Sequence, residues 1–187
     1  MYEKNISLDI SPEHPAYQWA KRQSDSVNAL GHIGTHIDCY TKVPAHTDYR
    51  TPVQIIDCSK GMPTIEQVKA LELKDKSLVL YTGNLEENGY GTPGYGALAT
   101  YLDSEVLDAI LAAKPKFIVI DSYGIGAHGD EHIAFDQRCE HHHCFVIENV
   151  CLTRDMLEHL CELAISFDAS SATTGKRCDV VAISHKQ

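Results

Sequence analysis

The sequence has no run of basic residues, no long apolar stretch and no CxxC pair. Its 187 residues carry a formal net charge of -10, with acidic residues spread along the chain. A surface of this kind repels phosphate backbones, so we expect no nucleic acid partner. Because no apolar stretch approaches the roughly 20 residues that span a bilayer, we also expect no membrane partner.

The cysteines lack the spacing of a metal site or a redox pair. They number seven, an odd count, and several lie within apolar runs such as 144–147. The first seven residues lack the basic and apolar segments of a secretory signal. We therefore expect reduced thiols in a cytoplasmic protein. Cys39 and Cys139 lie beside polar candidate residues and permit a redox interpretation, which nothing in their spacing requires.

The length and the hydrophobic pattern predict one α/β domain over residues 1–187. Apolar residues make up 43% of the chain and charged residues 22%, as in ordinary soluble proteins. Apolar alternation or continuous apolar runs predict strands at 6–10, 53–58, 77–82, 117–121, 144–148, 163–167 and 179–183. Because strands and helices alternate only loosely, we expect a mixed sheet flanked by helices.

The helix signals are fewer. Thr64-Ile65-Glu66-Gln67 resembles a capping box and predicts a helix to about Leu71. Asp103 or Ser104 can cap a second helix, and residues 153–160 are expected to form a third. The Gly- and Tyr-rich segment 86–97 is expected to be a loop, which could close over a substrate.

One short segment concentrates strong metal-ligand side chains. His32, His36 and Asp38 occupy positions i, i+4 and i+6, with Gly34 and Thr35 between them. The glycine and the β-branched threonine disfavour a helix and favour extended backbone from about 27 to 38. In a strand the three ligands share one face, so they can converge on one cation. Two imidazoles and a carboxylate are typical of a hydrolytic metal site that leaves positions open for water and substrate.

A second group of candidates lies further along the chain. Glu148 ends an apolar strand and must be satisfied there by a cation or by several donors. His132, Asp136 and Cys139 precede it. For Asp136, a helix cap or a surface ion pair is an equally good interpretation. The run 141–143 is three consecutive histidines, which cannot all face one ion from a regular element, so we expect a solvated turn.

The motif His32-x-Gly34-Thr35-His36-x-Asp38 resembles the signature of the cyclase family of metal-dependent hydrolases, which includes bacterial kynurenine formamidase and isatin hydrolase. Further blocks are similar to the family's strands and cover most of the chain from about Asn28 onward: 80–83, 118–122, 145–149 and 174–182. The resemblance implies a swivelling β/β/α fold, a Zn²⁺ or Mn²⁺ cofactor, a small-molecule substrate and a homodimer or homotetramer.

Two departures from the family pattern concern the site. Formamidase-type members continue after the aspartate as Ala-Pro-x-His, with a catalytic histidine where this chain has Lys42. His46 can supply a displaced equivalent. Those members also carry a histidine twelve residues before the glutamate, where this chain has Asp136. We therefore expect Lys42 to pair with Asp136 or Glu148 and to replace a second ion, which leaves one cation.

The resemblance implies hydrolysis of an amide, formamide, lactam or other cyclic C–N bond through an activated water. The expected metal ligands are His32, His36, Asp38, Glu148 and Asp136. His132 is the first candidate for proton transfer, followed by Glu148 and His46, and Lys42 is expected to stabilise an oxyanion or to orient a carboxylate. The rival interpretation is a protein that keeps the fold and binds a metal or a small ligand without turnover.

Overall fold

A computed structural model of the chain describes residues 1–18, 21–22 and 31–185. Part of the extended segment expected at 27–38, namely 27–30, lies outside the described residues. None of the helices in the described part of the chain combines the length and the apolar character that crossing a membrane requires.

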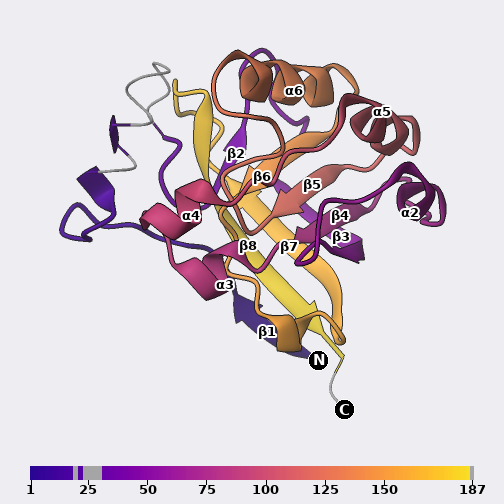
Figure 1. The fold of residues 1–187 in the computed structure, drawn as a ribbon, viewed down its shortest axis with the longest axis horizontal. Coiled ribbons are helices and arrows are strands. Elements are labelled where there is room, and N and C mark those ends of the chain that lie inside the picture. The colour runs from indigo at the N-terminus through magenta and orange to yellow at the C-terminus, as the bar shows by residue number, and fades with distance from the viewer. Residues whose placement is uncertain (19–20, 23–30, 186–187) are drawn as a thin grey trace.

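The centre of the molecule is an eight-stranded mixed sheet (Figure 1). Its strands are β1 (Tyr2–Asn5), β2 (His36–Asp38), β3 (Asp48–Asp57), β4 (Ser77–Tyr81), β5 (Phe117–Ile120), β6 (Phe145–Glu148), β7 (Leu160–Phe167) and β8 (Gly175–Ser184). Their spatial order is β1-β8-β2-β6-β5-β4-β3-β7, and β7 also pairs with β8. That last pairing closes seven strands into a barrel-like ring, with β1 added to the side of β8.

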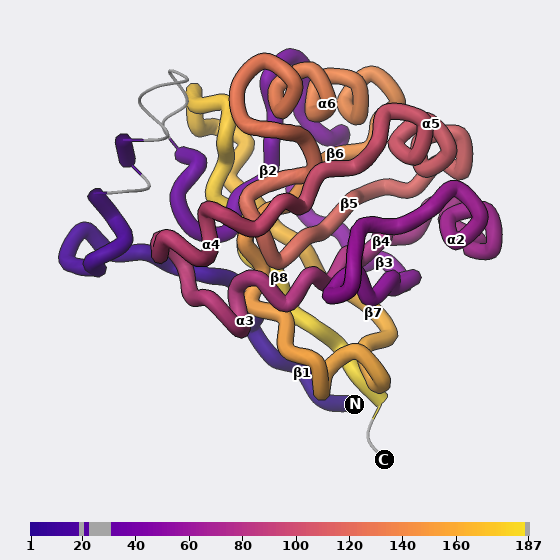
Figure 2. Tube along the Cα trace, in the orientation of Figure 1, coloured from indigo at the N-terminus to yellow at the C-terminus, as the bar shows by residue number. Residues whose placement is uncertain are grey.

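The sheet is mixed because its two parts run differently. Strands β3, β4, β5 and β6 are parallel to one another. Strand β2 pairs antiparallel with both β6 and β8, and β7 pairs antiparallel with both β3 and β8. Strand β1 and the end of β8 lie side by side (Figure 2). The expected mixed α/β sheet is therefore confirmed, and its closure into a ring is an addition that the strand pattern did not predict.

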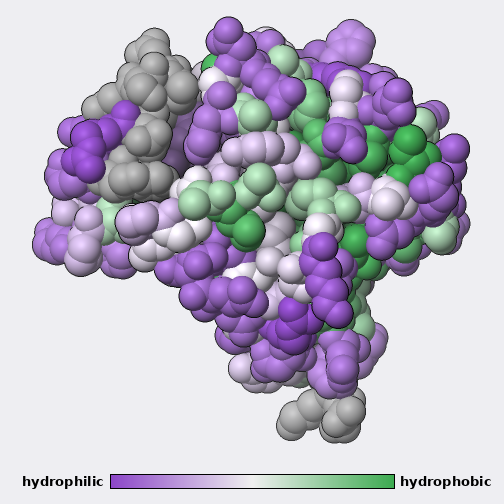
Figure 3. Space-filling view, in the orientation of Figure 1, coloured by the Kyte–Doolittle hydropathy of each residue, from purple (hydrophilic) through white to green (hydrophobic). Residues whose placement is uncertain are grey.

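Helices cover the parallel part of the sheet. They are α2 (Ile65–Lys69), α3 (Asn84–Asn88), α4 (Pro93–Ala97), α5 (Ser104–Ala112) and α6 (Asp130–His141), with a short 3₁₀ turn, η1 (Arg154–Met156). Figure 1 shows α2, α5 and α6 along one side of the sheet, and α3 and α4 beside its opposite end. The surface in this view is mostly hydrophilic, and its largest apolar area lies around α5 and α2 (Figure 3).

The core has two parts because side chains alternate along each strand. In β4, Val79 and Tyr81 point into the ring, whereas Leu78 and Leu80 point towards the helices. The ring interior is filled from every one of its strands, and the outer layer joins the sheet to α2, α5 and α6. Helix α6 contributes only Phe135 and Cys139 to that outer apolar layer.

Several local predictions are confirmed. Thr64 forms the expected capping box of α2: its side chain accepts the N–H of Gln67, and the Gln67 side chain accepts the N–H of Thr64. Asp103 is the N-cap residue of α5. The strands expected at 53–58, 77–82, 117–121 and 144–148 are present within one residue or form part of longer strands.

Three local predictions are wrong. The strand expected at 6–10 is instead β1, which ends before Ile6: the N–H of Ile6 still donates to Val180 in β8, but its carbonyl accepts from Cys151, outside that strand. The helix expected at 153–160 is only the turn η1, since strand pairing with β8 begins at Leu160 and overrides helix propensity. The loop expected at 86–97 contains most of α3 and all of α4.

Candidate metal centre

Strand β2 and the bend before it form one half of the site, which we call the β2 half. His36 and Asp38 alternate along β2 and share one face, and both side chains are 1% exposed. His32 reaches the same point from the bend rather than from a strand, so the expected regular strand is shorter than predicted. The Nδ1 atom of His32 lies 3.1 Å from Oδ1 of Asp38, and Nε2 of His36 lies 3.7 Å from the same oxygen.

A hydrogen bond fixes the orientation of each imidazole in the β2 half. Nδ1 of His36 lies 2.9 Å from the carbonyl oxygen of Gly34, which leaves Nε2 facing Asp38. Nε2 of His32 lies 3.1 Å from Oγ1 of Thr174, which leaves Nδ1 facing Asp38. Metal-binding histidines almost always use their second nitrogen in this way, because the outer bond selects the tautomer and holds the ring.

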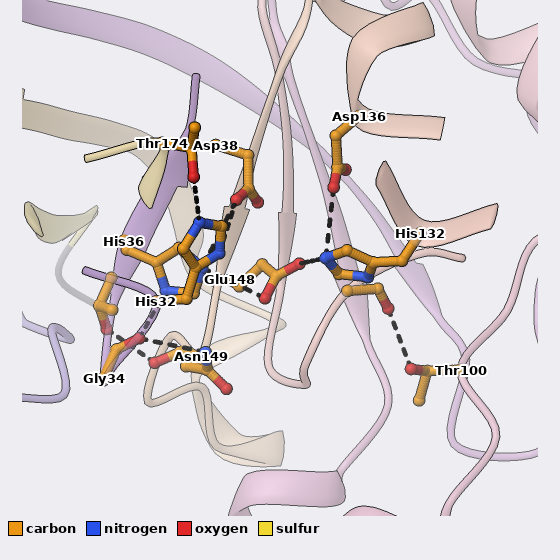
Figure 4. Close-up of polar contacts among 12 residues, drawn as sticks. His32, Gly34, His36, Asp38, Thr100, His132, Asp136, Glu148, Asn149 and Thr174 are labelled. Atoms are coloured by element: carbon orange, nitrogen blue, oxygen red, sulfur yellow. Dashed lines mark hydrogen bonds and ion pairs between the residues drawn. The ribbon is translucent and has the colours of Figure 1, made fainter. Parts of the chain in front are cut away.

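Gly34 is also bonded to more distant elements. Its carbonyl accepts from Nδ2 of Asn149 at 3.1 Å, and its N–H donates to the hydroxyl of Tyr90 at 3.2 Å. Tyr95, in α4, donates its hydroxyl to Oδ1 of Asn149. Asn149 follows β6 with a φ of 59°, the left-handed conformation that asparagine tolerates. A chain of hydrogen bonds thus runs from α4 to His36. Figure 4 shows its part at Asn149, Gly34 and His36.

Strand β6 and helix α6 supply the other half, which we call the α6 half. Glu148 ends β6 and is paired in register with His36. Its carboxylate lies between the two halves in Figure 4: Oε2 is 3.4 Å from Nε2 of His36, and Oε1 is 3.5 Å from Nε2 of His132. The Nε2 atom of His132 also lies 3.3 Å from Oδ2 of Asp136, four residues on along α6. Asp136 is buried within the helix, not a cap or a surface ion-pair residue.

Burial and mutual charge set the protonation of the imidazoles. Burial, together with the charge of His36, lowers the pKa of His32 to about 3. Burial would also lower the pKa of His36, but the charges of Asp38 and Glu148 outweigh burial and raise that pKa to about 9. Without a cation the β2 half therefore holds one neutral and one protonated imidazole at neutral pH. A cation held by Nε2 of His36 would require that imidazole to be neutral.

Burial raises the pKa of each carboxyl group, but the net shifts of the pKa differ in direction. Burial and the charge of Glu148 raise the pKa of Asp38 well above its usual range, and burial and the charge of Asp38 do the same for Asp136. Burial would raise the pKa of Glu148 too, but the charges of His132 and His36 outweigh it and lower that pKa to about 2. A bound cation would offset the burial and the mutual repulsion that raise the pKa of Asp38 and Asp136.

The donor atoms of the cluster fit divalent cations. Seven buried side-chain atoms have no hydrogen-bond partner among the described residues: Nε2 of His36, Oδ1 and Oδ2 of Asp38, Nδ1 of His132, Oδ1 and Oδ2 of Asp136, and Oε1 of Glu148. Possible ligand atoms fall into two groups, each within 4.8 Å. The first group is His32, His36 and Asp38, and the second is Asp38, His132, Asp136 and Glu148. Imidazole and carboxylate ligands suit Zn²⁺ and Mn²⁺.

Two glycines make room for the ligand side chains. A Cβ atom on Gly175 would lie 2.4 Å from Cδ2 of His32, in the β2 half. A Cβ atom on Gly124 would lie 2.4 Å from Cε1 of His132 and 2.5 Å from Oε1 of Glu148, in the α6 half. Gly124 also has a φ of +117°, which side chains rarely adopt. Each half of the site therefore depends on a backbone that approaches its ligands without a side chain.

Lys42 and His46 lie outside the cluster. The ammonium of Lys42 is 3.4 Å from the carbonyl oxygen of His141, at the C-terminal end of α6, where helix carbonyls favour a cation. The expected pairing of Lys42 with Asp136 or Glu148 is therefore wrong. His46 has an exposed side chain beside Tyr49, at the start of β3. The sequence pattern predicts the ammonium of Lys42 beside Asp136 or Glu148. In the structure the imidazole of His132 lies there instead, close to both carboxylates.

Sequence reasoning missed helix α6 itself. His132, Asp136 and Glu140 are spaced by four residues, which is the repeat that places side chains on one helix face. Polar residues at this spacing do not form an apolar stripe, so a search for hydrophobic periodicity passes over them. The run 141–143 is exposed around the end of α6, as expected.

Comparison with known proteins now gives the family. A family model described as "Putative cyclase" matches residues 5–127, about two thirds of the chain. The chain belongs to the cyclase family. The matched residues include the β2 half and end before α6. No curated protein matches the sequence.

Solved structures share this cyclase fold. A protein described as a potential metal-dependent hydrolase with cyclase activity is 13% identical, with a TM-score of 0.71, 100% of this chain covered and 99% of the other. A predicted metal-dependent hydrolase from Bacillus stearothermophilus is 14% identical, with a TM-score of 0.69 and 97% of each chain covered. An isatin hydrolase bound to the product analogue thioisatinate is 15% identical, with a TM-score of 0.61 and coverages of 99% and 83%. At these identities the likeness shows the fold alone.

Proposed function

We propose that this cyclase-family chain is a metal-dependent hydrolase that cleaves an amide, formamide, lactam or other cyclic C–N bond in a small molecule. The observation that carries the proposal is the set of buried, unpartnered ligand atoms in two groups that share Asp38. Such a set is costly in a folded protein unless it binds cations. Structurally similar proteins are described as a potential metal-dependent hydrolase and an isatin hydrolase, and this supports the reaction class.

The first group would hold one Zn²⁺ or Mn²⁺ through His32, His36 and Asp38, and the second group would hold another. When bound, such cations lower the pKa of a water from ~15.7 towards ~7 and polarise a carbonyl group. Asp38 contributes to both groups, so it sets their relative position. The fixed charge that we expected from Lys42 is absent here, and the second group is free to take an ion.

Proton transfer belongs to the α6 half in this proposal. His132 directs Nε2 towards Asp136 and Glu148, and we therefore assign that atom to the second group as a ligand, not as the proton acceptor expected from the sequence. Asp136 has two oxygens without hydrogen bonds, and one of them is enough for a ligand. The other can accept the proton of the attacking water and return it to the leaving nitrogen.

The α3–α4 segment contacts the residues that support the β2 half. Tyr95 is fully buried and bonded to Asn149, so it supports the β2 half instead of contacting a substrate. Tyr90 accepts the N–H of Gly34 through its hydroxyl. We propose that this segment positions the substrate from the side where Tyr90, between α3 and α4, meets Gly34.

A substrate screen with and without a chelator tests the proposal. Purified protein loaded with Zn²⁺ or Mn²⁺ is assayed on formamides, cyclic imides, lactams and lactones. We expect turnover of a C–N substrate that a chelator abolishes and the added metal restores. Turnover that a chelator leaves unchanged would overturn the metal mechanism. Tight metal binding without turnover of any class would favour the non-catalytic binding protein.

A further inference from the structure

A fourth buried carboxylate lies next to the cluster but belongs to neither group of ligands. Glu140 follows His132 and Asp136 on the same face of α6, and it is 1% exposed. A buried carboxylate needs compensation by a cation or by several donors. Both metal groups exclude Glu140, so its partners must come from elsewhere in the chain.

Those partners are the residues that follow β2. One oxygen, Oε1, accepts the N–H of Tyr40. The other, Oε2, accepts the N–H of Thr41 at 2.8 Å, the hydroxyl of Thr41 at 2.5 Å and the N–H of Lys42 at 3.0 Å. Consecutive N–H groups that converge in this way form an anion-binding concavity. Of the four donors, three bond to Oε2 and one to Oε1, so this segment provides a partner for each oxygen of Glu140.

These bonds join the two halves of the metal centre by a short route. Tyr40 lies two residues after Asp38, the ligand shared by both groups. Glu140 lies one helical turn after Asp136, which is about 6 Å along the helix axis. The separation of Asp38 and Asp136 therefore depends on a small ring of main chain closed by charge-assisted hydrogen bonds.

Helix α6 is anchored to α5 through Arg138, which bonds to Ser104 and Asp108, and to the segment after β2 through Glu140. Its buried residues are Phe135, Asp136, Cys139 and Glu140, and only two of these are apolar. A helix with so few apolar contacts relies on its polar anchors for its position. The ligands His32 and His36 have their own supports in Thr174 and Gly34, so they do not depend on Glu140.

We propose that Glu140 is a positioning residue that holds α6 against the segment after β2 and thereby sets the cation affinity of the second group. This inference rests on the proposed function, because it assumes that both groups bind cations. It predicts a selective effect: the second group weakens when Glu140 changes, while the first group keeps its affinity.

The test is a zinc titration of the metal-free full chain by calorimetry, with the wild type and Glu140→Gln compared. Glutamine keeps the shape but replaces one accepting oxygen by an NH₂ group, which opposes the N–H donors. We expect two binding events in the wild type, one at each group of ligands. We call binding at the first group the first event and binding at the second group the second event. In the variant the affinity of the second event should fall by about 10–100-fold. The first event should be unchanged.

Two further variants keep the test decisive. Glu105→Gln removes the same charge from an exposed position on α5 and should change neither event. Thr41→Val removes only the hydroxyl donor at an exposed position, so it should weaken the second event less and in the same direction. Thr41→Val decides the question if Glu140→Gln does not fold, as judged by near-ultraviolet circular dichroism.

Each outcome has a definite meaning. A single binding event in the wild type would overturn the second cation in the proposed function and this inference with it. Two events that remain unchanged in Glu140→Gln and Thr41→Val would overturn the inference and leave the proposed function intact. An equal loss at both events would show that Glu140 supports the fold in general, which also overturns the inference.

Discussion

The two halves of the candidate metal centre are built in different ways. The β2 half takes its ligands from seven consecutive residues, and main-chain and hydroxyl groups orient its imidazoles. The α6 half takes its ligands from a helix and from the end of β6, and it depends on how these elements are placed. Local spacing defines the first half, whereas tertiary packing defines the second. Variants should therefore affect the two halves separately, except at Asp38 and at Glu148, whose carboxylate faces both His36 and His132.

The largest effect is expected for Asp38→Asn, because this carboxylate belongs to both groups. The amide has one accepting oxygen and no charge, so neither group should retain a cation after dialysis. Hydrolysis should fall by at least about 10³-fold, beyond the loss of one electrostatic donor. Elemental analysis and turnover measure the two effects. The exposed Asp103→Asn is the control, and retention of two cations by Asp38→Asn would contradict the shared role.

His32→Ala and His132→Ala are each expected to lose one of the two cations, and a different one in each variant. Each removes one imidazole from one group, so each variant should bind one cation where the wild type binds two. Cobalt substitution distinguishes the sites, because the visible spectrum of the remaining ion reports its own ligands. If His132→Ala keeps both cations, His132 is not a ligand and is free to accept a proton instead.

Substitutions at Gly175 and Gly124 test the difference between the two halves through their packing. In Gly175→Ala the new Cβ contacts His32, and in Gly124→Ala it contacts His132 and Glu148. Overpacking of this kind costs about 1–3 kcal/mol. Gly124→Ala should be the more destabilising of the two, because its backbone φ of +117° is also strained. Denaturant unfolding of the metal-free proteins measures this order, and equal stability of both variants with the wild type would contradict the close approach.

A smaller loss of cation affinity is expected when the hydrogen bonds that lead from Tyr95 and Asn149 to His36 are removed. Asn149→Gly keeps the left-handed backbone and removes the amide that donates to Gly34, so the first cation should bind about 10–100-fold more weakly. Tyr95→Phe leaves that amide in place and removes only its partner, and its effect should be smaller. Zinc titration measures both. A loss confined to the second cation would contradict the hydrogen-bond path to His36.

The smallest effect is expected for Lys42→Met. The Lys42 side chain bonds only to a carbonyl at the end of α6 and has no ion pair among the described residues. Turnover and metal content should therefore change by less than about twofold, as for other surface charges. A loss of tenfold or more in turnover would restore the lysine to the site and reverse our correction.

The sequence predicted the β2 half because its ligands lie close together in the chain. One shared parity was enough to bring His36 and Asp38 to one face, although His32 arrives from a bend. Glu148 was also found, since a carboxylate at the end of an apolar strand needs a partner. The parallel strands were predicted for the same reason: their continuous apolar runs are local signals.

The features that the sequence did not predict depend on contacts between segments that are distant in the chain. The ring closes through β7 and β8, and no local pattern shows which strands meet. Helix α6 presents a largely polar face to the interior, which conceals it from hydrophobic periodicity. Lys42 was assigned to the cluster because it occupies a family position. Its side chain lies elsewhere because the main chain of 40–42 faces Glu140 instead.

Anomalous diffraction from a crystal grown with zinc or manganese tests the central claim most directly. We predict two peaks that share Asp38 as a ligand, one coordinated by His32 and His36 and the other by His132, Asp136 and Glu148. A single peak in the first group would contradict the two-cation centre. Side chains that point apart, with no anomalous density between them, would contradict the metal-dependent hydrolase as a whole.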